Sequence, residues 1–245
     1  MSSTTSLAGL NAPADHLRPA DVFMREIADS IVSGRYAEAE VLPPEAALGL
    51  HFRVSRTIIR ESMKRLEEKG LVAIQQGRGT LVQPRSHWNI LDPLVLSAII
   101  AHDEENHTLD ELTLIRSSLE SLMARQAASV AAQEQRDAIA AALQVMRDTA
   151  EDHAAFRDAD AAFHRLVMVV SGNFLAGNIA DTLYSHARHF ARFEGVPHAD
   201  SAAYTIDQHR AVADAIAAQD PEGAEAAMRH HILDAWRRRS GRNLQ

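Results

Sequence analysis

The chain has 245 residues and a formal net charge of −8 at pH 7, and it contains no cysteine, which excludes disulfides, thiolate metal sites and a cysteine nucleophile. Residues 1–15 lack the basic start and the apolar core of a signal peptide, so we expect them to form a disordered tail. Because its longest apolar runs are too short to span a bilayer, we expect a cytoplasmic protein with no membrane contact.

Residues 16–84 predict three helices followed by a hairpin. An apolar stripe at helical spacing covers residues 20–33 and stops at Gly34. A short helix over residues 43–50 opens with two prolines, and a third helix runs from its N-cap Ser55 to residue 69.

The hairpin follows directly after Gly70. Residues 71–74 and 80–82 are apolar segments of strand type, and the Gln-Gln-Gly-Arg-Gly stretch between them suits a bend. Three helices and a hairpin predict a winged helix-turn-helix, in which the third helix enters the major groove of DNA.

Basic residues concentrate in the third helix. The stretch 52–65 (FRVSRTIIRESMKR) has five Lys/Arg and one acidic residue, although the whole chain is acidic. Local enrichment of this kind is typical of DNA-binding proteins, while charge alone leaves open an ordinary solvated helix face. Arginines such as Arg56 and Arg60 can form two hydrogen bonds with guanine, and Ser55 and Thr57 at the helix N-terminus suit phosphate oxygens.

Residues 17–84 resemble the DNA-binding domain of the GntR family of bacterial transcription regulators. The resemblance rests on three motifs, L-P-P-E at 42–45, V-S-R-T-I-I-R-E at 54–61 and G-R-G-T at 77–80. It implies DNA contacts by Ser55, Arg56, Thr57, Arg60, Gln76 and Gly77. The family usually has arginine after the glutamate of the first motif; here Ala46 takes that place, so one DNA contact is expected to be missing.

The rest of the chain predicts an all-helical domain. We expect residues 85–107 to form a linker and the first helix of this domain, which then continues over residues 108–240. With the segment at 91–101, helical periodicity predicts about seven helices and no strand, at 108–130, 134–150, 154–171, 174–193, 202–218 and 222–238. The expected fold class is therefore mainly α, a winged helix-turn-helix followed by a helical bundle.

This second part is similar to the FCD-type ligand domain of the FadR subfamily within the GntR family. The matching features are Arg116 with Glu120, the D-A-A-F-H stretch at 160–164, the S-G-N stretch at 171–173, His209, and M-R-H-H at 228–231. The linker around Trp88 and the alanine at 46 resemble GntR repressors that respond to sugar acids such as galactonate.

Four residues form a candidate metal site. Asp160 and His164 are four residues apart, so they share one helix face, and His209 and His231 belong to two later helices. Three imidazoles and a carboxylate suit Zn, Ni or Mn, with open positions for a ligand. In a chain with thirteen histidines this spacing alone is weak evidence, but the resemblance implies a ligand role for all four positions.

The resemblance also implies that Arg116 binds the carboxylate of an effector; the alternative is an ion pair with Glu120. From its helix position, Arg188 is a second expected effector contact.

These features predict a homodimeric repressor that binds double-stranded operator DNA and is controlled by a small carboxylate effector, with a sugar acid expected. A metal-free regulator that responds to another acid or acyl-CoA is the alternative. A metal-dependent hydrolase is a more distant one, because the sequence contains no HExxH motif, no nucleophile elbow and no glycine-rich phosphate loop.

Overall fold

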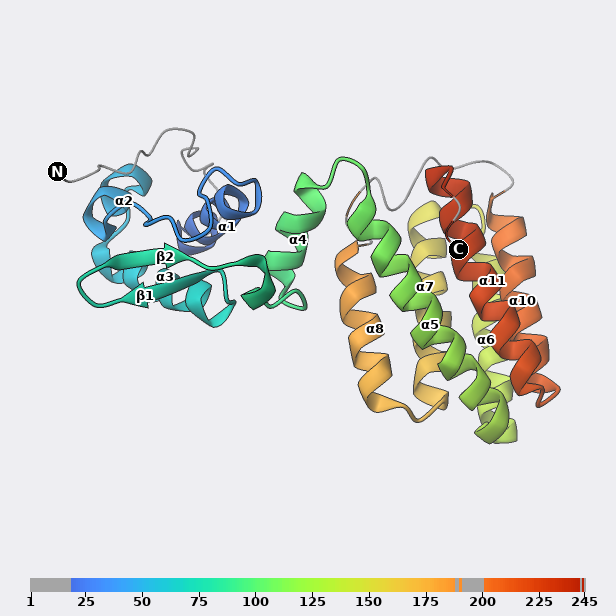
Figure 1. The fold of residues 1–245 in the computed structure, drawn as a ribbon. Helices are drawn as coiled ribbons and strands as arrows, with labels where there is room; N and C mark the ends of the chain where they lie inside the picture. Colours follow the sequence, from blue (N-terminus) through green and yellow to red (C-terminus); the bar gives the residue numbers. More distant parts are fainter. Residues whose placement is uncertain (1–18, 188–189, 191–200, 243, 245) are drawn as a thin grey trace. The chain divides into compact units, whose positions relative to one another are not determined.

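The structure, a computed structural model, describes residues 19–187, 190, 201–242 and 244. The expected tail over residues 1–15 lies outside these residues. The described chain is mainly helical, as predicted, with one two-stranded sheet (Figure 1). It divides into two compact units, Met1–Asn106 and His107–Gln245. None of the described helices has the length and apolar character needed to cross a membrane.

The first unit contains the winged helix-turn-helix. In chain order its elements are α1 (Pro19–Val32), α2 (Glu45–Phe52), α3 (Arg56–Glu68), β1 (Val72–Gln75), β2 (Gly79–Val82), the short 3-10 turn η1 (Arg85–His87) and α4 (Pro93–His102).

Helix α3 is amphipathic and sharply bounded. Ile59, Met63 and Leu66 are buried in the core of the unit. At its start the Ser55 hydroxyl oxygen accepts a hydrogen bond from the backbone N–H of Ile58 at 3.3 Å. Beyond its end Gly70 has a φ of +74°, and a side chain there would place its Cβ 2.0 Å from the backbone oxygen of His87.

The wing is an antiparallel hairpin attached to the end of α3. Its register pairs Val72 with Val82 and Gln75 with Gly79. The Glu67 carboxylate of α3 accepts a hydrogen bond from the backbone N–H of Ile74 at 2.7 Å. This bond links the wing to the third helix.

Helix α4 differs from the expectation that residues 85–107 belong to the linker and the C-terminal domain. It packs against α1, and its Val95, Ala98 and Ile99 lie in the core of the first unit. The Asp92 carboxylate caps α4 through the backbone N–H of Leu94 at 2.9 Å and also pairs with Lys69. The sequence shows that α4 has an apolar face but not which helix covers it.

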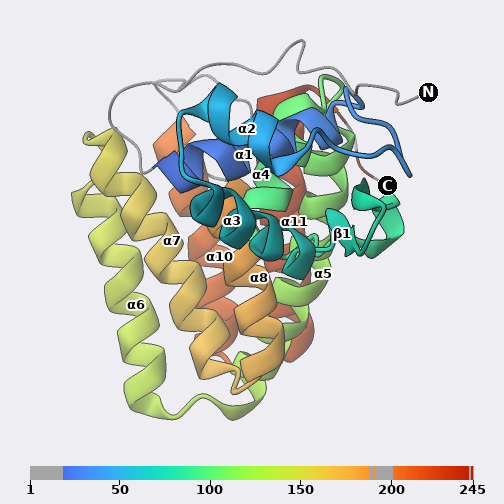
Figure 2. The same ribbon diagram turned by 90° about the vertical axis from the view of Figure 1, so that its left-hand side faces the viewer.

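The second unit is a helical bundle. Its helices are α5 (His107–Val130), α6 (Gln133–Asp148), α7 (His153–Val170), α8 (Phe174–Ala187), α10 (Ser201–Ala217) and α11 (Pro221–Ser240). They run alongside one another, and α5 contacts α7, α8, α10 and α11 (Figures 1 and 2). The part of the predicted helix 174–193 beyond residue 187 falls almost entirely outside the described residues.

Candidate DNA interface and metal centre

The outer face of α3 carries the predicted DNA contacts. Arg56, Thr57 and Arg60 are exposed, whereas the buried face of the helix consists of Ile59, Ser62, Met63 and Leu66. Both arginines can therefore project from the unit toward a groove. Ser55 is exposed as well, and its oxygen serves as the helix cap, which leaves its hydroxyl proton available for donation.

The two predicted wing residues lie at the tip of the hairpin. Gln76 and Gly77 are exposed, and Gly77 has a φ of +77°. Nothing lies within 4 Å of the position that a Cβ would occupy on Gly77. The backbone can thus approach a nucleic acid closely at this point.

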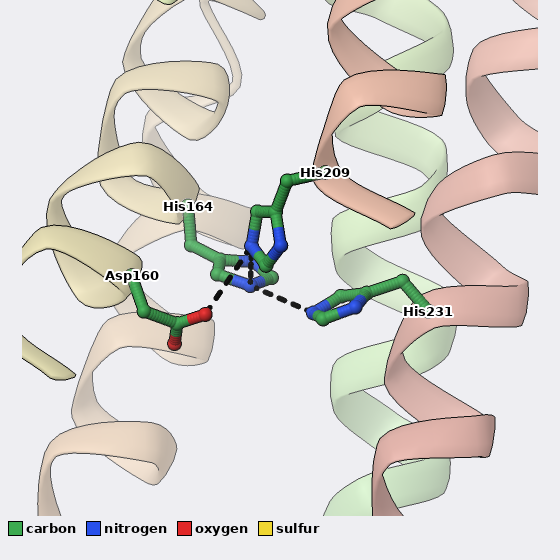
Figure 3. A group of neighbouring side chains, drawn as sticks. All are labelled: Asp160, His164, His209 and His231. Atoms are coloured by element: carbon green, nitrogen blue, oxygen red, sulfur yellow. Dashed lines mark hydrogen bonds and ion pairs between the residues drawn. The ribbon is translucent and has the colours of Figure 1, made fainter. Parts of the chain in front are cut away.

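In the second unit the fold brings the four predicted metal-binding residues together. Asp160 and His164 come from α7, His209 from α10 and His231 from α11 (Figure 3). One ligand atom from each lies within 4.8 Å of the other three. The histidines are almost fully buried, and the Asp160 side chain is 19% exposed.

The imidazole Nε2 atoms meet at the middle of this cluster. The His164 Nε2 is 3.2 Å from the Nε2 of both His209 and His231 (Figure 3). The His209 Nε2 is 3.3 Å from an Asp160 oxygen.

Hydrogen bonds at the opposite nitrogens fix the protonation of each ring. The Nδ1 of His209 is 2.8 Å from the backbone oxygen of Thr205, which can only accept, so this Nδ1 carries the proton. The Nδ1 of His164 donates to Glu120 at 2.6 Å.

His231 is fixed in the same way by Gln208. The Gln208 amide nitrogen donates to Asp234 at 3.1 Å, which turns the amide oxygen toward the Nδ1 of His231, at 3.1 Å. In each neutral ring the Nε2 lone pair is therefore directed to the centre of the cluster.

This donor set fits a divalent metal ion. The lone pair of His164 Nε2, 3.2 Å from the Nε2 atoms of His209 and His231, is repelled by their lone pairs when no proton or cation lies between them. Metal–nitrogen bonds of about 2.0–2.1 Å in a tetrahedral centre place neighbouring nitrogens about 3.3 Å apart, close to the spacing seen here. Outer hydrogen bonds from ligand histidines to carboxylate, amide and carbonyl oxygens are also typical of metal sites.

The electrostatics keep three of these residues, His209, His231 and Asp160, in their metal-binding forms. Burial lowers the pKa of His209 to about 4 and the pKa of His231 well below its usual range. For Asp160, burial favours the neutral acid, but His209, His164 and Arg116 outweigh it and lower the pKa of the carboxyl. At neutral pH His209 and His231 are thus neutral and Asp160 is ionised.

Arg116 forms an ion pair with Glu120, which was the alternative to effector binding. This ion pair is buried inside the protein. The Nε of Arg116 donates to Glu120 at 2.7 Å, and the two side chains are 6% and 2% exposed. Although burial opposes ionisation of Glu120, Arg116 and His164 lower the pKa of its carboxyl to about 2. The Arg116 guanidinium lies 4.1 Å from the ring centre of Tyr184, whose hydroxyl is 3.3 Å from an Asp160 oxygen.

Not every site residue could be found in the sequence. Tyr184 and Gln208 belong to the cluster only because of the way the helices cross, and no motif marks them. Thr205 lies one helical turn before His209. Its backbone oxygen is therefore placed near the His209 ring by the helix itself. The predicted effector contact Arg188 lies outside the described residues.

A winged helix-turn-helix with an exposed basic recognition helix is typical of a DNA-binding transcription regulator. Comparison with known families agrees. Residues 20–82 match the family "Bacterial regulatory proteins, gntR family", and residues 111–234 match the FCD domain. The chain belongs to the GntR family of transcription regulators and has an FCD domain.

Relatives and solved structures agree with this assignment. The galactonate operon transcriptional repressor of Escherichia coli K12 is 33% identical over 91% of this chain and 97% of its own length. The transcriptional repressor NanR of Cronobacter sakazakii is 30% identical over 90% of this chain and 85% of its own. These matched families and relatives are transcription regulators and not enzymes.

A solved structure described as Lar, which controls the Listeria monocytogenes agr system, has a TM-score of 0.59. It is 15% identical and covers 91% of this chain and 97% of its own, so it supports the fold alone.

Proposed function

We propose that this regulator is a repressor whose operator affinity is controlled by a small carboxylate bound beside a divalent metal, Zn, Ni or Mn, in the second unit. The observation that carries the proposal is the convergence of three Nε2 lone pairs and an ionised carboxylate, each held by outer hydrogen bonds. GntR regulators bind operator DNA. In this proposal the winged helix-turn-helix binds the operator, and ligand binding at the donor cluster changes its affinity.

In the first unit, Arg56 and Arg60 would read guanine edges in the major groove, and Ser55 and Thr57 would contact phosphates. Gln76 and Gly77 would approach the minor groove from the wing. A homodimer would present two such helices to the two halves of a pseudo-palindromic operator.

The effector class follows from the chemistry of the site. A metal ion that takes five or six ligands would keep open positions beside these four protein ligands, and such positions accept a carboxylate and an adjacent hydroxyl. Arg116 uses its Nε for Glu120, and the structure records no hydrogen bond for its outer nitrogens within the described residues, so they can pair with a carboxylate. A relative named for the galactonate operon favours a sugar acid; Arg188 is proposed as a second contact.

Metal analysis tests the site. Protein purified without an affinity tag and dialysed against Zn or Mn should contain about one metal ion per chain. The His231→Ala variant should lose the ion. The matched control is His230→Ala, because His230 is adjacent in sequence but exposed. Equal metal content in both variants would reject the site.

Operator binding tests the control. Duplexes from the protein's own promoter region should bind more tightly than random duplexes in a fluorescence anisotropy titration. A sugar acid such as D-galactonate should weaken this binding with metal-loaded protein and not with chelated protein. An equal response after chelation would instead favour the metal-free regulator, and no response to any sugar acid would reject this effector class.

A further inference from the structure

Both carboxylate oxygens of Glu120 are occupied, by two residues with different tasks. One oxygen accepts from the Nε of Arg116 at 2.7 Å, and the other accepts from the Nδ1 of His164 at 2.6 Å. All three side chains are between 2% and 6% exposed, so water does not screen these contacts. Glu120 therefore joins a proposed effector contact to a proposed metal ligand.

The two hydrogen bonds of a buried carboxylate compete for one negative charge. His164 becomes a stronger donor at Nδ1 when its Nε2 carries a divalent cation, and it then draws charge on Glu120 away from Arg116. In the other direction, an acidic group on the outer nitrogens of Arg116 neutralises the guanidinium. More of the charge of Glu120 is then available to His164, whose imidazole becomes a better metal ligand.

Tyr184 provides a second connection between the same two sites. Its ring stacks under the Arg116 guanidinium, and its hydroxyl is 3.3 Å from Asp160, another proposed metal ligand. Arg116 thus contacts the neighbours of two metal-binding residues, one through a carboxylate and one through a phenol.

We propose that Glu120 is a positioning residue shared by the metal centre and Arg116, so that metal binding and neutralisation of Arg116 by an acidic ligand strengthen each other. The inference rests on the proposed metal site. Because such a coupling is reciprocal, it can be measured from the metal side alone, without knowing the effector.

A double-mutant cycle on Zn affinity tests the coupling, with Arg116→Gln as a mimic of a neutralised arginine. Zn affinity would be measured by competition with a fluorescent chelator. We expect Glu120→Gln to weaken Zn binding by about 10- to 100-fold and Arg116→Gln to strengthen it. In the double variant the effect of Arg116→Gln should shrink, since its carboxylate partner is gone.

The matched control is Arg125→Gln, which removes the same charge from the same helix. Arg125 is exposed and pairs with Glu225 at 2.9 Å, so its replacement should leave Zn affinity unchanged. Additive effects of the two substitutions, or weaker Zn binding in Arg116→Gln, would overturn the inference. A wild-type chain that binds no metal would overturn both the site and the inference, whereas bound metal with additive effects would overturn the inference alone.

Proton NMR provides a readout that remains if Glu120→Gln does not fold. The His164 Nδ1–H signal should lie far downfield because of its short bond to Glu120. We expect it to move further downfield in Arg116→Gln, in which the carboxylate has a single partner. An unchanged signal in that variant would contradict a shared carboxylate.

Discussion

Arg60 is the residue on which the DNA-binding proposal can be tested most directly. It is exposed in the second turn of α3, and the structure records no ion pair for it within the described residues. Arg60→Gln should therefore leave thermal stability unchanged. Affinity for the operator should fall by about 1–3 kcal/mol, with a smaller loss for random duplexes, because the side chain would read a base.

The control for this prediction is Arg65→Gln, which changes an exposed arginine in the last turn of the same helix. Both variants would be compared by anisotropy at two salt concentrations. If Arg65→Gln reduces operator preference as much as Arg60→Gln, the helix contributes general positive charge and not base recognition.

Among the elements, α4 is held to the recognition helix by one side chain. One Asp92 oxygen caps α4, at 2.9 Å from the backbone N–H of Leu94, and the other pairs with Lys69 at the end of α3. Asp92→Ala should lower the free energy of unfolding of this unit by about 1–2 kcal/mol. Asp92→Asn keeps the capping oxygen and should cost less.

Urea unfolding followed by fluorescence can measure these losses within the full chain. Trp88 is the tryptophan of the first unit and Trp236 that of the second, so a Trp236→Phe background reports the first unit. As the control, Asp152→Ala removes the cap of α7 in the other unit and should leave this transition unchanged. If Asp92→Asn lowers the free energy of unfolding as much as Asp92→Ala, the charge of Asp92 and not its helix cap provides most of the stabilisation.

In the metal-free protein, the stability of the helices around the histidine cluster should depend on pH. Burial lowers the pKa of His209 from its ordinary 6.5 to about 4, so between these values the unfolded chain binds a proton that the folded chain does not. The stabilisation is present above pH 6.5 and is lost as the pH falls toward 4. For His209 the loss is on the order of 3 kcal/mol, and His231 acts in the same direction.

Chemical denaturation at pH 7 and pH 5, with and without bound Zn, checks this prediction. Bound Zn should add stability at pH 7 and should steepen the loss at lower pH, because protons compete for the same Nε2 atoms. His230→Gln is the control and should not alter the dependence. A metal-free protein with equal stability at pH 5 and pH 7 would contradict the buried neutral imidazoles.

At the level of elements the sequence is a good guide to local structure. The N-cap Ser55 and the glycine after α3 define the recognition helix from neighbouring residues alone, and the structure confirms the mainly α fold with its winged helix. The packing of α4 on α1 could not be predicted, because the sequence of an apolar helix face does not specify which helix covers it. The tautomers set by Gln208 and Glu120 were also missed, since they depend on contacts between distant helices.

At the scale of the whole molecule, the proposed homodimer requires a surface on which a second copy can pack. An apolar surface lies at the end of α7 and the start of α8, where Val169, Phe174 and Leu175 are 75%, 76% and 72% exposed. Beside it Arg165 and Asp181 lie 3.8 Å apart, so the surface carries both charge signs. Such a surface can face itself across a two-fold axis, as a dimer on a pseudo-palindromic operator requires.

We therefore expect Leu175→Asp to convert a dimer into a monomer in analytical ultracentrifugation. Metal content should be unchanged, because the Leu175 side chain is exposed whereas the three histidine ligands are buried. Operator affinity should fall by about 10²- to 10⁴-fold, since each half-site would then be bound independently. Val145→Asp, at an exposed apolar residue of α6, is the control and should remain dimeric. A Leu175→Asp protein that stays dimeric would place the interface on another surface, and a wild-type monomer that binds its operator tightly would reject the two-copy arrangement.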